Sequence, residues 1–184
     1  MKYNSCLLIF GMVLMCTGCI GVRKGPAKPA GELIASDRLL LRDPFIFYDR
    51  KTDWYYTYAS NKPGIKAWRS KDLQYWEALG NVFTASENFW GKQDFWAPDC
   101  YYYKGRYYLF VTFSGVDKIR GTSILVSEYP DKDFYPLTNA PITPKNWMCL
   151  DASLYIDKEQ KPWMVFSREW LEVSDGEIYA QQLS

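Results

Sequence analysis

The stretch that decides the fold is residues 42–49, which reads RDPFIFYD. It opens with an aspartate beside a proline and continues as an apolar, aromatic run. A polar turn at residues 49–53 separates this run from a second one, residues 54–59, which reads WYYTYA. Two β-favouring runs around a short polar break predict an antiparallel hairpin.

The same unit returns twice along the chain. Its second copy, residues 97–113, reads APDCYYYKGRYYLFVTF, and its third, residues 151–167, reads DASLYIDKEQKPWMVFS. Asp43, Ala97 and Asp151 open the three copies and are spaced 54 positions apart. A repeat of this length made of strands is typical of a β-propeller blade.

The repeat predicts an all-β fold, a β-propeller with about three blades in this chain. Only residues 177–184 follow the third copy, so we expect the third blade to reach about its third strand. A propeller needs at least four blades to close and hide its strand edges. We therefore expect an open arc and an incomplete chain.

Composition limits the chemistry. The chain has 184 residues, enough for one domain, with 22 basic against 21 acidic residues, which gives no indication of nucleic-acid binding. It contains no histidine, which excludes Ser-His-Asp hydrolysis, Cys-His proteolysis and histidine-ligated zinc within it. Aromatic residues make up 18% of the chain; they serve sheet packing or stack on sugar rings. Carboxylates are left as the natural catalytic groups.

Residues 1–19 resemble a bacterial lipoprotein signal, with cleavage after Gly18 and lipidation of Cys19. Ordinary secretory cleavage is the alternative. Residues 20–36 are rich in glycine and proline and are predicted to be a flexible tether, which leaves residues 37–184 as the propeller domain. We expect an exported protein, periplasmic or at the cell surface, held to a membrane through Cys19.

Two cysteines, Cys100 and Cys149, lie outside the signal region. An oxidising compartment permits a disulfide between them, and two buried free thiols are an equal alternative. Neither is spaced for metal binding, and the sequence predicts no metal site.

Asp43 and Asp151 are the candidate catalytic residues. Both begin the innermost strand of a blade, and innermost strands run the same way around a propeller's channel, so both carboxylates should point into one funnel. Paired carboxylates in an aromatic-lined cleft are the minimum equipment for glycosidic bond hydrolysis. The alternative is that Asp-Pro only starts a strand or forms a turn.

At residues 38–184 the chain resembles glycoside hydrolase family 43, five-bladed propeller enzymes acting on arabinose- and xylose-containing polysaccharides. The likeness rests on RDPFI at 42–46, FWAPD at 95–99, LDASLYID at 150–157 and FSREW at 166–170. It implies that Asp43 is the general base of an inverting reaction and that Asp151 tunes the acid and orients the sugar. Trp96 could wall the sugar site or pack between blades. The resemblance implies no cofactor, although a structural calcium is possible in the complete propeller.

The family's general acid is usually a glutamate in the fourth blade. Within this chain the candidate is Glu169, as the acid or as a hydrogen-bonding partner of the sugar. Its alternatives are a salt bridge independent of Arg168 or a solvated loop position.

Three other readings stay open. The protein could be a non-catalytic, sugar-binding propeller on a membrane tether, or the inactive product of an interrupted reading frame. A fructan-hydrolase propeller also carries Arg-Asp-Pro, but ranks lower because the nucleophile motif of that group is absent.

Overall fold

The computed structural model describes residues 32–184, which form strands and one short 3-10 turn, η1 (Ser36–Arg38). The strands are β1 (Leu33–Ala35), β2 (Ile46–Asp49), β3 (Trp54–Asn61), β4 (Gly64–Ser70), β5 (Tyr75–Thr84), β6 (Gln93–Tyr103), β7 (Arg106–Ser114), β8 (Arg120–Ser127), β9 (Tyr135–Pro136), β10 (Cys149–Ile156), β11 (Pro162–Arg168) and β12 (Glu177–Gln182). No α-helix occurs in this part of the chain. The all-β prediction is confirmed.

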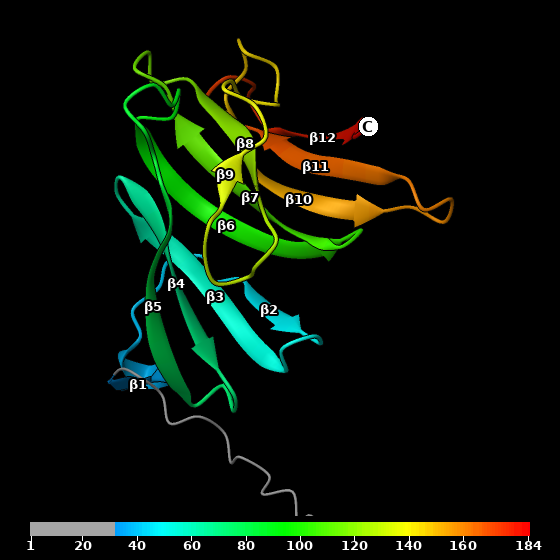
Figure 1. Ribbon diagram of the computed structural model, residues 1–184. Coiled ribbons are helices and arrows are strands. Elements are labelled where there is room, and N and C mark those ends of the chain that lie inside the picture. Colours follow the sequence, from blue (N-terminus) through cyan, green and yellow to red (C-terminus); the bar gives the residue numbers. More distant parts are fainter. Residues whose placement is uncertain (1–31) are drawn as a thin grey trace, which may run out of the picture.

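The strands form three antiparallel sheets that follow one another along the chain (Figure 1). The sheet orders are β1-β5-β4-β3-β2, then β6-β7-β8-β9, then β10-β11-β12. Strand β6 contacts both β2 and β10, so the first strands of the three repeats are neighbours. This is the arrangement of consecutive propeller blades. The described chain forms three of them, and the third has the three strands that the sequence predicted.

The 54-residue repeat is visible in the backbone itself. Asp43, Ala97 and Asp151 all adopt the left-handed conformation, with φ of 49°, 43° and 53°. Only a few per cent of residues other than glycine do so, which makes a coincidence at three equally spaced positions improbable. Each copy therefore begins with the same bend, whether its first residue is an aspartate or an alanine.

Aromatic packing joins the first two blades. Phe113 on β7 lies edge-on to Phe83, Phe89, Trp90 and Phe95, with ring centroids 4.9–6.2 Å apart. Edge-to-face contacts of this kind add about 0.5–1.5 kcal/mol each to the burial of the rings. Blades one and two are thus held rigidly to each other.

A smaller apolar cluster joins blades two and three. Its buried members are Phe110, Ile124, Cys149, Ala152, Met164 and Phe166. Ala152, next to Asp151, belongs to this cluster, so the bend at the start of β10 is anchored in the interface between the blades.

The predicted tether is wrong at its carboxyl end. Leu33–Ala35 form β1, which pairs with β5 and extends the first sheet to five strands. The hydroxyl of Ser36 accepts a hydrogen bond from the indole N–H of Trp76 at 3.0 Å. These contacts attach residues 33–36 to the outer edge of blade one, so the folded domain begins before residue 37. The rest of the tether, the signal segment and Cys19 lie outside the described residues.

Cys100 and Cys149 are both buried free thiols. They belong to different apolar clusters, Cys100 between blades one and two and Cys149 between blades two and three. Of the two alternatives for these cysteines, the structure has the free thiols.

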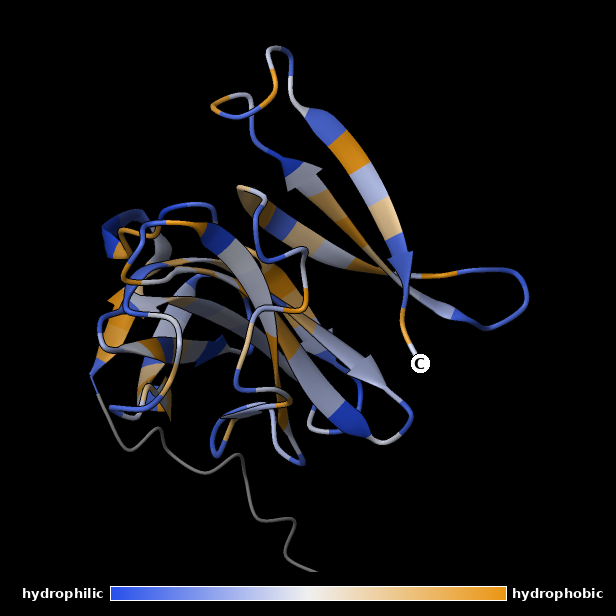
Figure 2. Ribbon diagram, turned by 90° about the horizontal axis from the view of Figure 1, so that it is seen from above, coloured by the Kyte–Doolittle hydropathy of each residue, from blue (hydrophilic) through white to orange (hydrophobic). Residues whose placement is uncertain are grey.

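Strand β12 lies at the edge of the third sheet and pairs only with β11 among the described strands. Hydrophobic and hydrophilic residues alternate along it (Figure 2), and Ile178 is 73% exposed. Among residues 32–184 no helix has the length and apolar character that crossing a membrane would require.

Candidate active site

Asp43 lies in the loop directly before β2, with its backbone in the left-handed region. Pro44 follows it, and a residue before proline is kept away from the right-handed helical region. Aspartate is one of the few residues that tolerate the left-handed region instead. Its side chain is 61% exposed, and a carboxylate oxygen lies 3.3 Å from Nε of Arg42. The bend therefore presents an accessible carboxylate beside an exposed guanidinium.

Asp151 is the third residue of β10, at a β-bulge where the pairing with β11 shifts. Its backbone N–H donates a hydrogen bond to Oγ1 of Thr112 on β7, at 3.1 Å. Thr112 is buried and is the register partner of Trp96 on β6. The second blade thus fixes the bend from which the Asp151 carboxylate projects.

The charges around Asp151 show which groups share its neighbourhood. Partial burial raises the pKa of the Asp151 carboxyl above its ordinary value. The negative charges of Asp43 and Glu169 raise this pKa further, and the positive charge of Arg42 lowers it. Such effects act over short range, so the structure brings the three carboxylates named from the sequence into one region.

Glu169 follows the last residue of β11 and is only 7% exposed. Its carboxylate accepts a hydrogen bond from Nη1 of Arg120 at 2.5 Å, and its own N–H donates to the carbonyl of Met148 at 2.7 Å. Arg168 binds Glu172 instead, at 2.7 Å. Of the alternatives named for Glu169, the structure has the salt bridge independent of Arg168.

Trp96 lies half-buried on β6, and two guanidinium groups lie over its ring. The guanidinium carbon of Arg120 lies 4.8 Å from the centre of the indole, and that of Arg42 lies 5.5 Å from it. Trp96 also lines a cavity of about 290 Å³ together with Arg42 and Asp43. The candidate base and the candidate sugar-stacking residue therefore open into the same space, between blades one and two.

Sequence reasoning missed Arg120, Asp94 and Thr112. Arg120 begins β8, and its Nε lies 3.4 Å from Asp94, which also accepts a hydrogen bond from the hydroxyl of Ser114 at 2.5 Å. Arg120 and Glu169 are 49 positions apart, and no local pattern marks either residue. The sequence around Arg120 carries no distinguishing signal: Lys118 lies two residues before it, and the position 54 residues earlier is also a cation, Lys66.

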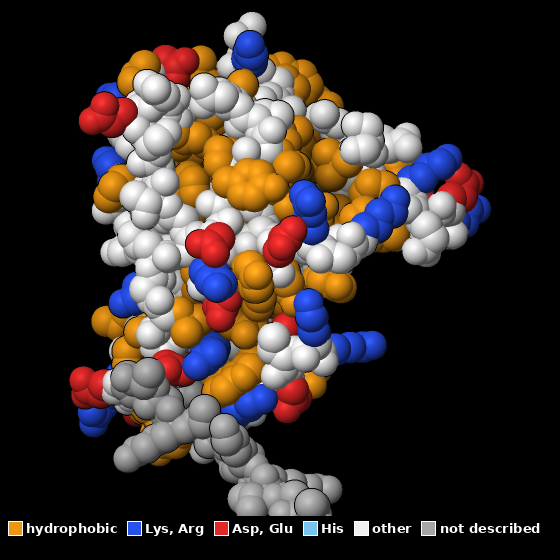
Figure 3. Space-filling view, in the orientation of Figure 1, with side chains coloured by type: hydrophobic (Ala, Val, Ile, Leu, Met, Phe, Trp, Pro, Cys, Tyr) orange, Lys and Arg blue, Asp and Glu red, His pale blue; other side chains and the backbone are white. Residues whose placement is uncertain are grey.

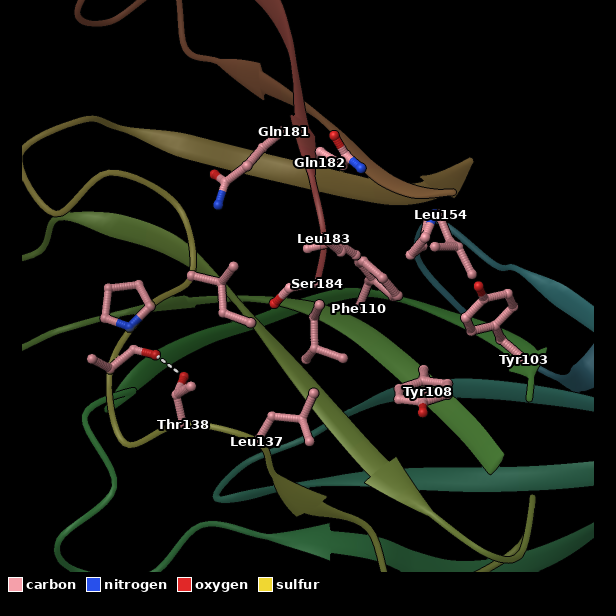
Figure 4. A pocket seen from close by; sticks show the side chains of 15 residues that line it. Tyr103, Tyr108, Phe110, Leu137, Thr138, Leu154, Gln181, Gln182, Leu183 and Ser184 are labelled. Atoms are coloured by element: carbon pink, nitrogen blue, oxygen red, sulfur yellow. Dashed lines mark hydrogen bonds between the residues drawn. The ribbon is translucent and has the colours of Figure 1, made fainter. Parts of the chain in front are cut away.

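A larger cavity of about 640 Å³ lies between blades two and three (Figure 4). Tyr108, Phe110, Leu137 and Leu183 line it, and none of the candidate carboxylates does. On the face shown in Figure 3, acidic and basic side chains lie next to one another with hydrophobic side chains between them. Within residues 32–184 no group of three or more metal-ligating side chains comes together.

Comparison with known sequences decides the family. The sequence model described as "Glycosyl hydrolases family 43" matches residues 38–184, which hold every strand of the three blades except β1. The chain belongs to this family. Solved relatives in this family are five-bladed β-propellers, and the three described blades fit a part of such a fold.

Two characterised relatives show the likeness in sequence. The chain is 26% identical over 178 residues to the extracellular endo-alpha-(1->5)-L-arabinanase 1 of Bacillus subtilis (strain 168), covering 89% of this chain and 53% of that protein. It is also 26% identical over 137 residues to the extracellular exo-alpha-(1->5)-L-arabinofuranosidase ArbA of Cellvibrio japonicus (strain Ueda107), covering 66% of this chain and 39% of that protein. The chain spans about half the length of the first relative and about two fifths of the second.

A solved structure shows a closer likeness. The endo-arabinase from Bacteroides thetaiotaomicron VPI-5482 is 58% identical and superposes with a TM-score of 0.79, over 82% of this chain and 53% of that one. Here too the chain matches about half of its relative.

Proposed function

We propose that the protein is a glycoside hydrolase that cleaves arabinan by an inverting, single-displacement reaction with Asp43 as general base. The observation that carries the proposal is that Asp43 and Asp151 occupy equivalent repeat positions, in the same left-handed bend, close enough for the charge of one to shift the pKa of the other. A propeller whose bends served only to start strands would not need an acidic group at two of three positions.

Asp43 would remove a proton from the attacking water. The role needs an accessible carboxylate beside the attacking water, and the Asp43 side chain is 61% exposed, with Nε of Arg42 3.3 Å from its carboxylate. Asp151 would act as a second negative charge that keeps the proton donor protonated and helps to orient the sugar. An inverting pair would stand roughly 6.5–9.5 Å apart, which leaves room for the water.

Glu169 fits the role of charge partner better than that of proton donor. A general acid must carry a proton to the leaving group, whereas the Glu169 carboxylate is an acceptor in an ion pair with Arg120. The resemblance to the family places the acid in a fourth blade, and we propose that it is supplied from there.

We propose an α-1,5-linked arabinan as substrate, because both characterised relatives are named for activity on that linkage and the solved relative is named an endo-arabinase. An arabinan is uncharged, which suits a cavity where the carboxylate of Asp43 is offset by the guanidinium of Arg42.

The test is Asp43→Asn in the full-length protein, assayed on debranched arabinan. Turnover should fall by about 10²- to 10⁴-fold, the usual contribution of a general base, with the melting temperature preserved. Asp53→Asn is the matched control, since Asp53 is also an exposed aspartate with a left-handed backbone, at the hairpin end of the same blade. Full activity in Asp43→Asn would sink the assignment of the base.

The first-formed product decides the stereochemistry. Proton NMR of early reaction should show an anomer opposite in configuration to the substrate; retention would contradict the inverting mechanism.

The second candidate is sugar binding without cleavage. It is favoured by the ion pair with Arg120, which occupies the carboxylate of Glu169, the candidate proton donor within residues 32–184. Wild-type protein that binds arabino-oligosaccharides in calorimetry but releases no product would support this alternative.

We further propose that the protein is exported and held to a membrane by a lipid on Cys19. The two characterised relatives are named as extracellular, which supports export. The anchor rests on the signal-like residues before Cys19. Replacement of Cys19 by serine should move the protein from the detergent phase to the aqueous phase; unchanged partitioning would refute the anchor.

A further inference from the structure

An arginine that binds a glutamate and lies over a tryptophan occurs three times in residues 32–184. The sets are Arg69 with Glu77 and Trp54, Arg120 with Glu169 and Trp96, and Arg168 with Glu172 and Trp147. The distances are alike, 2.5–2.7 Å between the charged atoms and 4.1–4.8 Å from the guanidinium carbon to the ring centre. One local arrangement is therefore used in three settings.

Only the set around Arg120 joins different blades. Arg120 and Trp96 belong to the second sheet, whereas Glu169 follows β11 of the third. The other two sets each lie within one sheet and its loops. The Arg120 set is also the one beside the candidate catalytic carboxylates, since Trp96 lines the cavity with Asp43 and Glu169 influences Asp151.

The arrangement is costly as a stabilising device. Arg120 is 19% exposed, and it faces two carboxylates, Glu169 at 7% and Asp94 at 26%. Burying charges in this way commonly gains little stability over apolar packing, because the charges lose their hydration. The hydrogen bond to Glu169 and the 3.4 Å ion contact of Nε with Asp94 do, however, orient the planar guanidinium over the ring of Trp96.

We propose that Arg120 is a positioning residue for the sugar site, holding Trp96 and Glu169 to each other across the boundary between blades two and three. The proposal rests on the proposed function. Arg42, the other cation over Trp96, is 81% exposed and is free to yield to a ligand, whereas Arg120 is held in place. Of the two cations over the Trp96 ring, Arg120 is therefore the one that keeps a constant position.

The decisive comparison is Arg120→Lys against Arg69→Lys in the full-length protein. Lysine keeps the positive charge but lacks the planar fork, so both variants disturb the same local arrangement. We expect similar, small losses of melting temperature in the two. On debranched arabinan, Arg120→Lys should lower kcat/KM by about 10- to 100-fold, because misplacement of the sugar slows the reaction, while Arg69→Lys keeps the wild-type value.

Two results would overturn the proposal while leaving the proposed function intact: wild-type kinetics in Arg120→Lys, or losses in both variants that follow only their melting temperatures. If wild-type protein does not cleave arabinan, the proposed function fails and the positioning role falls with it.

Should Arg120→Lys fold poorly, Glu169→Gln gives a second test. Asp43, Glu169 and Arg42 act on Asp151, whose charge also acts on the half-buried Asp99 of β6. Glutamine at position 169 removes one of these negative charges while keeping an acceptor for Arg120. Loss of the charge of Glu169 should lower the pKa of Asp151, so the acidic limb of the pH–rate profile, to which the ionisation of Asp151 contributes, should move to lower pH. Glu77→Gln, which changes the equivalent glutamate of the Arg69 set, should leave the limb in place. A profile unchanged by Glu169→Gln would refute the role of Arg120 and Glu169 at the site.

Discussion

The clusters around Arg69 and Arg120 have the same chemistry and different surroundings. Each arginine binds a buried glutamate, with side-chain exposures of 6% for Glu77 and 7% for Glu169. Trp54, under Arg69, pairs with Asp49 at the hairpin end of β2, whereas Asp43 and its cavity lie at the opposite end. The contacts of a cluster therefore do not reveal its role. The role of a cluster follows instead from the end of the strands at which the cluster lies.

Replacement of the two tryptophans should separate those roles most clearly. Trp96→Ala should lower kcat/KM on debranched arabinan by about tenfold or more, since loss of an aromatic contact worth near 1.4 kcal/mol has that effect. Trp54→Ala should lower the melting temperature and leave kcat/KM close to wild type. Equal kinetic losses in both variants would show that the two ends of the blades are not functionally distinct.

The two ends of β10 should also differ in how an aspartate at each end affects the melting temperature as the pH changes, which is a smaller effect. At the cleft end, burial and the charges of Asp43 and Glu169 raise the pKa of Asp151. Folding thus favours the neutral form of Asp151. The resulting contribution to the stability of the folded protein is present below the ordinary pKa, about 3.9, and is lost as the pH rises through the raised pKa. Asp151→Asn should therefore raise the melting temperature at pH 7, and the gain should vanish below that ordinary pKa.

At the hairpin end, Asp157→Asn is the control of opposite sign. A hydrogen bond from the indole N–H of Trp163, at 2.9 Å, lowers the pKa of Asp157, with backbone N–H groups adding to the effect. Its stabilising contribution is present above the ordinary pKa and lost as the pH falls through the lowered value. The asparagine variant should melt earlier at pH 7. Shifts of the same sign in the two variants would contradict this comparison.

The smallest expected effect concerns the thiols. Burial raises the pKa of Cys100 to about 12 and that of Cys149 to about 11. The thiolate is the reactive form, so a thiol reagent at pH 8 should label neither in the folded protein. As denaturant is added, Cys149 should react first, since its apolar cluster is the smaller. Prior labelling of Cys100 would show that the interface between blades one and two is the weaker.

Much of the fold was predictable because its signals are local. Strand-forming runs and polar turns recur with a fixed spacing, and the spacing identifies Asp43 and Asp151 together. Strand β1 was not predicted, because three residues at the end of a glycine- and proline-rich segment carry little pattern and their pairing with β5 is a long-range contact. The partner of Glu169 was missed for the same reason, since Arg120 reaches it only after two blades have packed.

The left-handed bend at Ala97 has a consequence of its own. Blade two keeps the backbone of the carboxylate positions while carrying only a methyl group there. The backbone conformation at these positions therefore does not depend on the carboxylate. The side chain can be exchanged there without a change in the course of the backbone. A designer seeking a third functional group on this scaffold would find its location already prepared.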